Sequence, residues 1–486
     1  MTAIPRSSYI LALTVLGASF IGLVTALALP FVLSPVQYIT FSLVAATSQL
    51  ITSIAYEWIR ISVIRHIGGD RPDLSTLRSE LTGLYVVTTA ALISCAIIFL
   101  LGSLLFNPLL VAGLTCLCAA LQGVFEGRSA WARAHFDNLR LSVAAIARPI
   151  FMFALVIGFA TISRSAIWAI LGLCSSYPLS MLVFGDRPSG ILTEIRLDRS
   201  RVLSLFKFGS VAALGANLSL AVPAALRAII IAALGPTAAG GSLLALDIGQ
   251  RAFGTLGTSL NTLSLQSLIR TFDSVPKEDG VRYARNFIGT GVLMVSWVTV
   301  ILALLSPLAG NFAPTAYREN FITWAPLVLI LVAALSARQY TMDPVFIVYH
   351  RVEFLPVSPA LIMLLLGICL LAHRTFGISD TTFFYGLALS AVGGIISAII
   401  CLRILSSLII PWSLFATAAL SVGLAQLSRY MMPEAAPWLS IPSLALMATI
   451  LFWIPILFFN TLSLRTNALL LLGKIVRKSG LTNDTN

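Results

Sequence analysis

The chain is poor in charged residues. Only 10% of its 486 residues are Asp, Glu, Lys or Arg, against about 25% in soluble domains, whereas 58% are hydrophobic. Apolar runs of about 20 residues recur from one end to the other, each long enough to cross a hydrocarbon core roughly 30 Å thick. Because no long polar region separates these runs, the sequence predicts a polytopic membrane protein without a soluble domain.

Signatures of catalysis and of metal binding are also missing. The sequence has no Walker motif, glycine-rich nucleotide loop or nucleophile elbow. Its four histidines lack ligand spacing, and its six cysteines lie inside apolar runs, where a free thiol behaves as a small hydrophobic group. We therefore expect no enzyme activity, no zinc site and no disulfides. We expect no cofactor either, and leave a proton or a sodium ion open as the coupling ion.

Breaks between the apolar runs divide the chain into fourteen predicted transmembrane helices. They cover residues 9–32, 37–59, 81–106, 108–127, 139–160, 164–184, 208–234, 237–268, 286–309, 321–348, 354–373, 380–402, 410–430 and 438–460. We divide the chain into an N-terminal lobe of six helices (1–185), a cytoplasmic amphipathic connector (186–207), a second lobe of six helices (208–405), a final helix pair (406–462) and a cytoplasmic tail (463–486).

The basic residues between the helices are distributed asymmetrically. If the amino terminus is cytoplasmic, the opposite side keeps only Arg164, Arg318, Arg374 and Arg429. The positive-inside rule therefore predicts that both termini are cytoplasmic. The same asymmetry accounts for the net charge of +12, with a secondary attraction to anionic membrane lipids. We expect no nucleic-acid partner.

Two segments of the chain resemble each other. LSPVQYITFSLVAATSQL (33–50) and LGPTAAGGSLLALDIGQR (234–251) align Gln49 with Gln250. Each segment is a short external turn that enters a helix, and each helix runs on to a basic cytoplasmic loop. The first six predicted helices are followed by six more in the same orientation. We therefore interpret the chain as a parallel duplication with a helix pair added at its carboxyl end.

Four arginines lie within predicted helices: Arg148, Arg227, Arg251 and Arg338. An arginine at a helix centre costs about 2.5 to 3.5 kcal/mol on insertion scales, so each of them should face water, a partner or a ligand. A guanidinium group binds phosphate through two parallel hydrogen bonds and stays charged. These four arginines, with Gln339 beside Arg338, are therefore our candidates for binding a diphosphate and its glycan.

Local ion pairing is the alternative for several of these charges. Asp247 lies one helical turn before Arg251, so the two share a helix face and Asp247 could orient Arg251. Arg338 could reach Asp343, whereas Arg227 has no evident local carboxylate partner. For the two glutamates near cytoplasmic helix ends, the alternative is an interfacial ion pair. The candidate gating or coupling residues are Asp247, Asp343, Glu57 and Glu126.

Three segments resemble one known family. They are LRAIIIAALGPTAAGGSLLALDIGQ (226–250), LSPVQYITFSLV (33–44) and NFAPTAYRENFITWAPLVLILVAALSARQY (311–340). The family is that of the Wzx-type polysaccharide flippases, within the multidrug/oligosaccharidyl-lipid/polysaccharide (MOP) exporter superfamily, which also holds lipid II flippases and MATE drug exporters. Many relatives carry an acidic residue immediately before the helix-seven arginine, where this chain has Leu226.

The resemblance implies an all-α fold of two six-helix lobes around a central cavity, an added helix pair and alternating access. It implies as cargo an undecaprenyl-diphosphate-linked oligosaccharide, turned across the bacterial cytoplasmic (inner) membrane for polysaccharide biosynthesis and export. A polysaccharide polymerase and glycosyltransferases would be partners. A lipid II flippase and a cation-coupled multidrug antiporter of the MATE type stay open as alternatives. The short external loops argue against a membrane enzyme such as a polymerase.

Overall fold

The computed structural model describes residues 6–67, 74–134, 138–183, 198–260, 277–349 and 351–406, with scattered positions at 268 and between 410 and 453. All regular structure in these ranges is helical. The first half of the chain forms α1 (Arg6–Val32), α2 (Pro35–Ile67), α3 (Leu74–Gly102), α4 (Pro108–Ala134), α5 (Asn138–Ser163) and α6 (Ala166–Val183). The second half forms α7 (Arg199–Leu260), α9 (Lys277–Phe312), α10 (Thr315–Ala337), a π-helical turn (Arg338–Met342), α11 (Asp343–Val348), a 3-10 turn (Val352–Phe354), α12 (Val357–Phe376) and α13 (Asp380–Ser406).

The described helices confirm the predicted all-α polytopic membrane fold. Ten helical segments are long and apolar enough to cross a membrane, and α1 adds a shorter apolar stretch, Gly17–Val32. One of the ten segments, in α7, consists of two helices joined at a kink. Each of the first twelve predicted helices therefore has a counterpart. The predicted helices over 410–430 and 438–460 lie almost wholly outside the described residues.

Gly235 divides α7 into a first arm (199–234) and a second arm (236–260). Its backbone has φ 80° and ψ 164°, a conformation that glycine adopts at no steric cost because it lacks a Cβ atom. Pro236 then suits the first turn of the second arm, where no N–H donor is needed. The two arms are the predicted helices over 208–234 and 237–268. The first arm begins at Arg199 and continues without a break through the carboxyl end of the expected connector.

The predicted helix over 321–348 is divided in the structure into α10, the π-helical turn and α11. Pro344 gives the physical reason, because its ring has no N–H and clashes with the carbonyl group four residues earlier in a regular helix. A wider turn before the proline relieves that clash. Arg338 and Gln339, both predicted site residues, lie in this wider turn.

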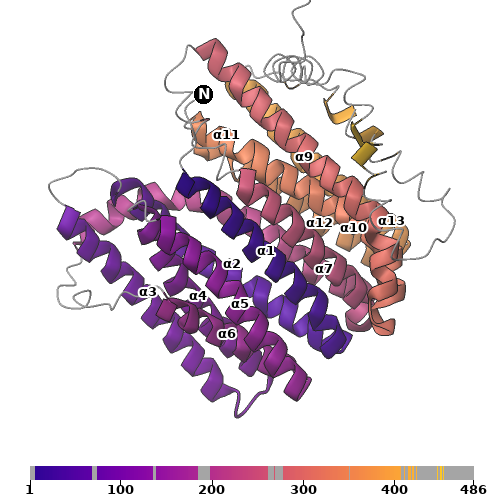
Figure 1. Ribbon diagram of the computed structural model, residues 1–486, viewed down its shortest axis with the longest axis horizontal. Helices are drawn as coiled ribbons and strands as arrows, with labels where there is room; N and C mark the ends of the chain where they lie inside the picture. The colour runs from indigo at the N-terminus through magenta and orange to yellow at the C-terminus, as the bar shows by residue number, and fades with distance from the viewer. Residues whose placement is uncertain are drawn as a thin grey trace, which may run out of the picture.

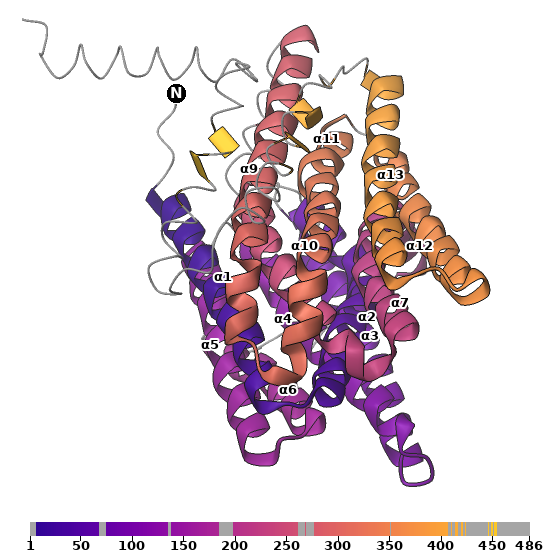
Figure 2. The same cartoon turned by 90° about the vertical axis from the view of Figure 1, so that its right-hand side faces the viewer.

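The helices form two bundles that pack side by side (Figure 1). In the first, α1 and α6 pack on α5, and α2 and α3 pack on α4; in the second, α10 packs on α7, α9 and α13, and α12 packs on α7 and α13. The bundles meet chiefly where α2 and α1 pack against α7. Figure 2 shows the second bundle from its own side, with α10, α12 and α13 facing the viewer.

The short connections gather at one end of the molecule, which we call the short-loop end. The Tyr317 hydroxyl, at the start of α10, donates to the Leu33 carbonyl between α1 and α2 at 2.8 Å. The Ala166 amide, at the start of α6, donates to Gln37 Oε1 in α2 at 2.7 Å. Three connections that are distant in the sequence therefore meet there. The charge distribution predicts that this end is external.

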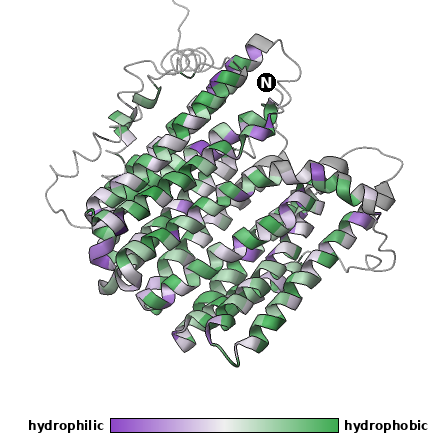
Figure 3. Ribbon diagram, turned by 180° about the vertical axis from the view of Figure 1, so that it is seen from behind, coloured by the Kyte–Doolittle hydropathy of each residue, from purple (hydrophilic) through white to green (hydrophobic). Residues whose placement is uncertain are grey.

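Hydrophobic residues occupy most of the length of the helices (Figure 3). Large ones such as Ile98 and Leu101 of α3, Ile162 of α5, and Leu389 and Ile404 of α13 are exposed at the surface. In water such exposure would be unfavourable, whereas in a bilayer these side chains contact lipid tails. The packed core lies between the helices and extends through both bundles.

Candidate transport cavity

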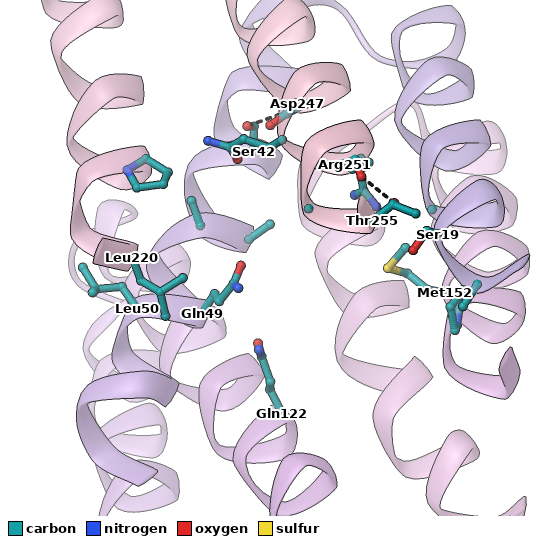
Figure 4. A pocket seen from close by; sticks show the side chains of 18 of the residues that line it. Ser19, Ser42, Gln49, Leu50, Gln122, Met152, Leu220, Asp247, Arg251 and Thr255 are labelled. Carbon is teal, nitrogen blue, oxygen red and sulfur yellow. Dashed lines mark hydrogen bonds between the residues drawn. The ribbon is translucent and has the colours of Figure 1, made fainter. Parts of the chain in front are cut away.

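A cavity of about 530 Å³ lies between the two bundles. Helices α1, α2, α4, α5 and α6 line it from the first bundle, and α7, α10 and the π-helical turn line it from the second. Figure 4 shows Ser42 and Asp247 toward one end of the cavity, Gln122 toward the other, and Arg251 at the side where Ser19 and Met152 lie. Three of the four arginines singled out in the sequence line this cavity: Arg148, Arg227 and Arg251.

Arg251 presents an unpaired cation to the cavity. It lies in the second arm of α7, and its side chain approaches α1 closely enough that a Cβ atom added at Gly22 would come within 2.8 Å of Nη1. Its guanidinium group has no hydrogen bond or ion pair with any residue that the structure describes. The dashed line beside it in Figure 4 is the hydrogen bond from the Thr255 hydroxyl to the Arg251 carbonyl. The guanidinium group is therefore available to a ligand.

Asp247 pairs with Arg227, not with Arg251 as its spacing suggested. Arg227 Nη2 lies 2.5 Å from Asp247 Oδ1. The turn at Gly235 folds the second arm of α7 back along the first, which brings these two residues opposite each other. Arg227 thus acquires the carboxylate partner that its local sequence lacks. Both side chains are largely buried.

Two hydroxyl groups of α2 join this ion pair from the other bundle. The Tyr38 hydroxyl donates to Asp247 Oδ2 at 2.5 Å, and the Ser42 hydroxyl donates to the same oxygen at 3.1 Å. Arg227 Nε in turn donates to Ser42 Oγ at 3.0 Å. Sequence reasoning missed both α2 residues. Their signal is faint: two hydroxyls one helical turn apart in an apolar stretch.

Arg227 is anchored further within α7. It donates to the Pro223 carbonyl, one turn earlier in the same helix, at 3.1 Å and to Gln250 Oε1 at 2.8 Å. The Gln250 Nε2 donor is buried without a partner among the described residues. Gln250 lines the cavity, as does its counterpart in the repeat, Gln49.

Arg148 contacts a hydroxyl and two aromatic rings. Its Nη2 donates to the Tyr177 hydroxyl at 3.0 Å. Its guanidinium carbon lies 4.9 Å from the centre of the Tyr177 ring and 5.6 Å from that of Phe125, within the range of cation–π attraction. No described carboxylate forms an ion pair with it. Sequence reasoning missed Tyr177, because nothing in its local pattern distinguishes it from a packing residue.

Gln339 lines the cavity, but its neighbour Arg338 does not. Arg338 is 2% exposed; its Nη2 donates to the Ser219 hydroxyl at 2.8 Å and lies 3.3 Å from Asp343 Oδ2. Adjacent residues in a helix point in different directions, and here Gln339 faces the cavity while the Arg338 side chain is directed toward Ser219 and Asp343. Arg338 and Asp343 therefore form a buried ion pair behind the cavity wall.

The two predicted glutamates also lie outside the cavity lining. Glu57 is buried and pairs with Arg60 of its own helix at 2.6 Å. Glu126 accepts a hydrogen bond from Gln122 Nε2 at 2.8 Å. The structure thus brings Arg148, Arg227, Arg251, Gln339 and Asp247 together at one cavity, and it places Arg338, Asp343, Glu57 and Glu126 around it.

The charge of the lining is predominantly positive. Three guanidinium groups and one carboxylate, that of Asp247, border the cavity. The carboxylate is shared with Arg227, so Arg148 and Arg251 are left to set the potential inside. In a low-dielectric surrounding, that potential favours an anion.

Comparison with known proteins gives the fold. No protein-family model matches the chain, and no curated protein matches its sequence. Among solved structures, the lipid II flippase MurJ in an inward closed conformation has a TM-score of 0.67, with 11% identity over 93% of this chain and 98% of that chain. A MOP-superfamily transporter from Pyrococcus furiosus has a TM-score of 0.57, and a MATE protein in complex with MaL6 has 0.54. Each of these two is 13% identical over 83% of this chain and 96% of its own. The chain thus has the fold of MOP-superfamily transporters.

Proposed function

We propose that the protein is a flippase for an undecaprenyl-diphosphate-linked oligosaccharide, which it turns across the bacterial cytoplasmic membrane by alternating access. The observation that carries this proposal is the unpaired guanidinium group of Arg251, which shares one cavity with Arg148. A charge inside a membrane is expensive unless it meets a partner. In a transporter, the cargo can be that partner, so we assign the cargo as the ligand of the Arg251 guanidinium group.

A diphosphate suits this cavity in charge and in hydrogen bonding. Arg251 comes from the second bundle and Arg148 from the first, so a ligand with two phosphates can bridge them through paired N–H donors. The volume of about 530 Å³ lies within the usual range of ligand pockets, roughly 300 to 1,000 Å³. Amide side chains beside the arginines can bond sugar hydroxyls: Gln49, Gln122 and Gln339.

Alternating access requires contacts between the bundles that can part. Toward the short-loop end, the hydroxyls of Tyr38 and Ser42 bond Asp247 of the other bundle. Farther along the same helix pair, the Ser53 hydroxyl donates to Asn217 Oδ1 at 2.6 Å. We assign Asp247 to the gate on the short-loop side, and we assign Ser53 and Asn217 to the opposite one. Both termini are cytoplasmic in this scheme.

A cation-coupled drug antiporter of the MATE type fits the cavity less well, because cationic drugs favour acidic linings and this lining is basic. A lipid II flippase uses the same diphosphate chemistry, and the fold similarity to MurJ supports that class equally. The two flippase functions differ in the glycan. In the favoured scheme, glycosyltransferases supply the cargo and a polysaccharide polymerase consumes it.

The test is a flipping assay in proteoliposomes with lipid-linked cargo labelled on the glycan. We expect Arg251→Ala to abolish the flipping that the unaltered protein supports. Arg351→Ala should retain it, because Arg351 is exposed and its ion pair among the described residues is with Glu353. Normal flipping by a folded Arg251→Ala protein would refute the proposed site. Flipping of lipid II and not of other diphosphate-linked glycans would assign the cargo to cell-wall synthesis instead.

A further inference from the structure

The arginines within the membrane-spanning helices differ in how their charge is balanced. Arg227 and Arg338 each have a carboxylate in direct contact. The guanidinium group of Arg148, by contrast, touches only the Tyr177 hydroxyl and two aromatic rings among the described residues. A buried charge needs compensation from somewhere, so the surroundings of Tyr177 are informative.

A chain of hydrogen bonds leads from Arg148 to a carboxylate. Arg148 Nη2 donates to the Tyr177 hydroxyl at 3.0 Å, and that hydroxyl donates to Gln122 Oε1 at 3.1 Å. Gln122 Nε2 then donates to Glu126 Oε1 at 2.8 Å. The four residues come from α5, α6 and α4, all in the first bundle. Figure 4 shows Gln122 directed into the cavity.

The direction of this chain is set at its far end. A carboxylate only accepts hydrogen bonds, so Glu126 attracts the amino group of Gln122 and turns the amide oxygen toward Tyr177. Tyr177 must then donate to that oxygen, which leaves its own lone pairs for Arg148. Aligned hydrogen bonds polarise one another. The negative charge of Glu126 therefore acts on Arg148 through two neutral side chains.

This arrangement compensates the charge of Arg148 without using most of its N–H donors. A guanidinium group has five N–H donors, of which Tyr177 takes one. A direct ion pair would use the two parallel donors that a phosphate needs. The Tyr177 and Phe125 rings hold the plane of the group, and its remaining donors have no hydrogen-bond partner among the described residues.

We propose that Tyr177 and Gln122 are positioning residues, which hold Arg148 ready for the diphosphate of the cargo, and that Glu126 is a remote counter-ion at the end of the hydrogen-bond chain. This rests on the proposed flippase function. Glu126 is also within electrostatic range of Arg60, but the direct partner of Arg60 is Glu57. Glu126 is thus left to serve the hydrogen-bond chain.

The experiment exploits two effects of opposite sign. Calorimetry would measure binding of farnesyl diphosphate to the purified full chain. Tyr177→Phe keeps the ring and removes the hydroxyl, so we expect about tenfold weaker binding, the usual effect of losing a hydrogen bond to a charged group. In Glu126→Gln, the amide oxygen of the new side chain can still accept from Gln122, but the negative charge is gone. We expect about threefold tighter binding, because the electrostatic potential at Arg148 becomes more positive.

Gln122→Leu provides a second break in the chain and should weaken binding as Tyr177→Phe does. Tyr56→Phe is the matched control, because it removes a buried hydroxyl of the same bundle, bonded to Thr89 at 2.8 Å, and should leave binding unchanged. In the flipping assay, Glu126→Gln should lower both KM and the maximal rate, since tighter cargo leaves more slowly.

The outcomes separate the two proposals. Weaker binding in both Tyr177→Phe and Glu126→Gln, or values equal to those of Tyr56→Phe, would overturn the positioning role. If Tyr177→Phe does not fold, Gln122→Leu and Glu126→Gln decide the matter by the same opposite signs. Unchanged binding and flipping in Arg251→Ala would instead refute the flippase site, whatever the hydrogen-bond chain does.

Discussion

The two aligned helices of the repeat both line the cavity but differ in their charged residues. Gln49 in α2 aligns with Gln250 in the second arm of α7, and both line the cavity. The charged residues of that arm, however, align with apolar ones: Asp247 with Ala46, and Arg251 with Leu50. The fold tolerates either set, because packing needs only helices of suitable length. The packing pattern that the two halves share therefore does not require the charges of α7.

Within the aligned segments, α2 contributes neutral donors and the second arm of α7 contributes ions. Tyr38 and Ser42 of α2 bond the carboxylate of Asp247, while their own aligned positions in α7 are Ala239 and Leu243. Between the bundles, a hydroxyl can bond a carboxylate and release it at small cost, since hydrogen bonds are exchanged readily with water or ligand. Ions confined to one bundle do not have to separate when the bundles part.

The largest effect that follows from this comparison is on stability. Asp247→Asn leaves Arg227, which is 6% exposed, without its counter-ion, and breaking one side of a buried pair costs about 3 to 5 kcal/mol. We expect a lower Tm in a thermal unfolding assay of the detergent-solubilised protein. A small polar substitution at the aligned position of α2, Ala46→Ser, should leave Tm nearly unchanged. Equal Tm values for Asp247→Asn and the unaltered protein would mean that the pair is dispensable.

The next effect concerns where the cavity charge resides. Arg251→Leu should weaken binding of farnesyl diphosphate about 10- to 100-fold, the range expected for losing hydrogen bonds between ions. Adding Leu50→Arg moves the cation to the first bundle at the aligned position, which also lines the cavity. We expect the double variant to recover most of the binding. Failure to recover any, in a folded protein, would show that position as well as charge is required.

A smaller effect is expected at the contact between the bundles. Tyr38→Phe removes one hydrogen bond to a carboxylate, worth about 1.5 to 3 kcal/mol, and leaves the ring packed edge-on against Tyr317. The state in which α2 packs on Asp247 should become less populated, which cysteine accessibility on the short-loop side can measure. Tyr56→Phe is the control, because its hydroxyl bonds Thr89 within the first bundle and makes no hydrogen bond between the bundles in the described residues. Greater accessibility in the control than in Tyr38→Phe would contradict the gate.

Sequence alone predicted the fold better than the site. The twelve described spans follow from apolar runs, because a bilayer imposes one length and one polarity on every helix. The sequence also singled out the cavity arginines through their cost in hydrocarbon. It could not predict their partners. Asp247 is closer to Arg251 along the helix, yet it pairs with Arg227 because the chain folds back at Gly235. Arg148 is connected to Glu126 only through the packing of α4, α5 and α6.

The aligned glutamines offer the smallest and most specific test of the comparison. Gln250 Oε1 accepts from Arg227 at 2.8 Å, whereas Gln49 lines the cavity from α2, a helix that contributes no charged side chain to the cavity lining. Gln250→Leu should cost about 1 kcal/mol or less, because the lost hydrogen bond is partly offset by removal of the unpartnered Nε2 donor. Gln49→Leu should leave Tm unchanged but weaken binding of a diphosphate-linked glycan relative to farnesyl diphosphate. If Gln250→Leu and Gln49→Leu changed Tm and glycan binding by the same amounts, the two glutamines would have the same role despite the different charges beside them.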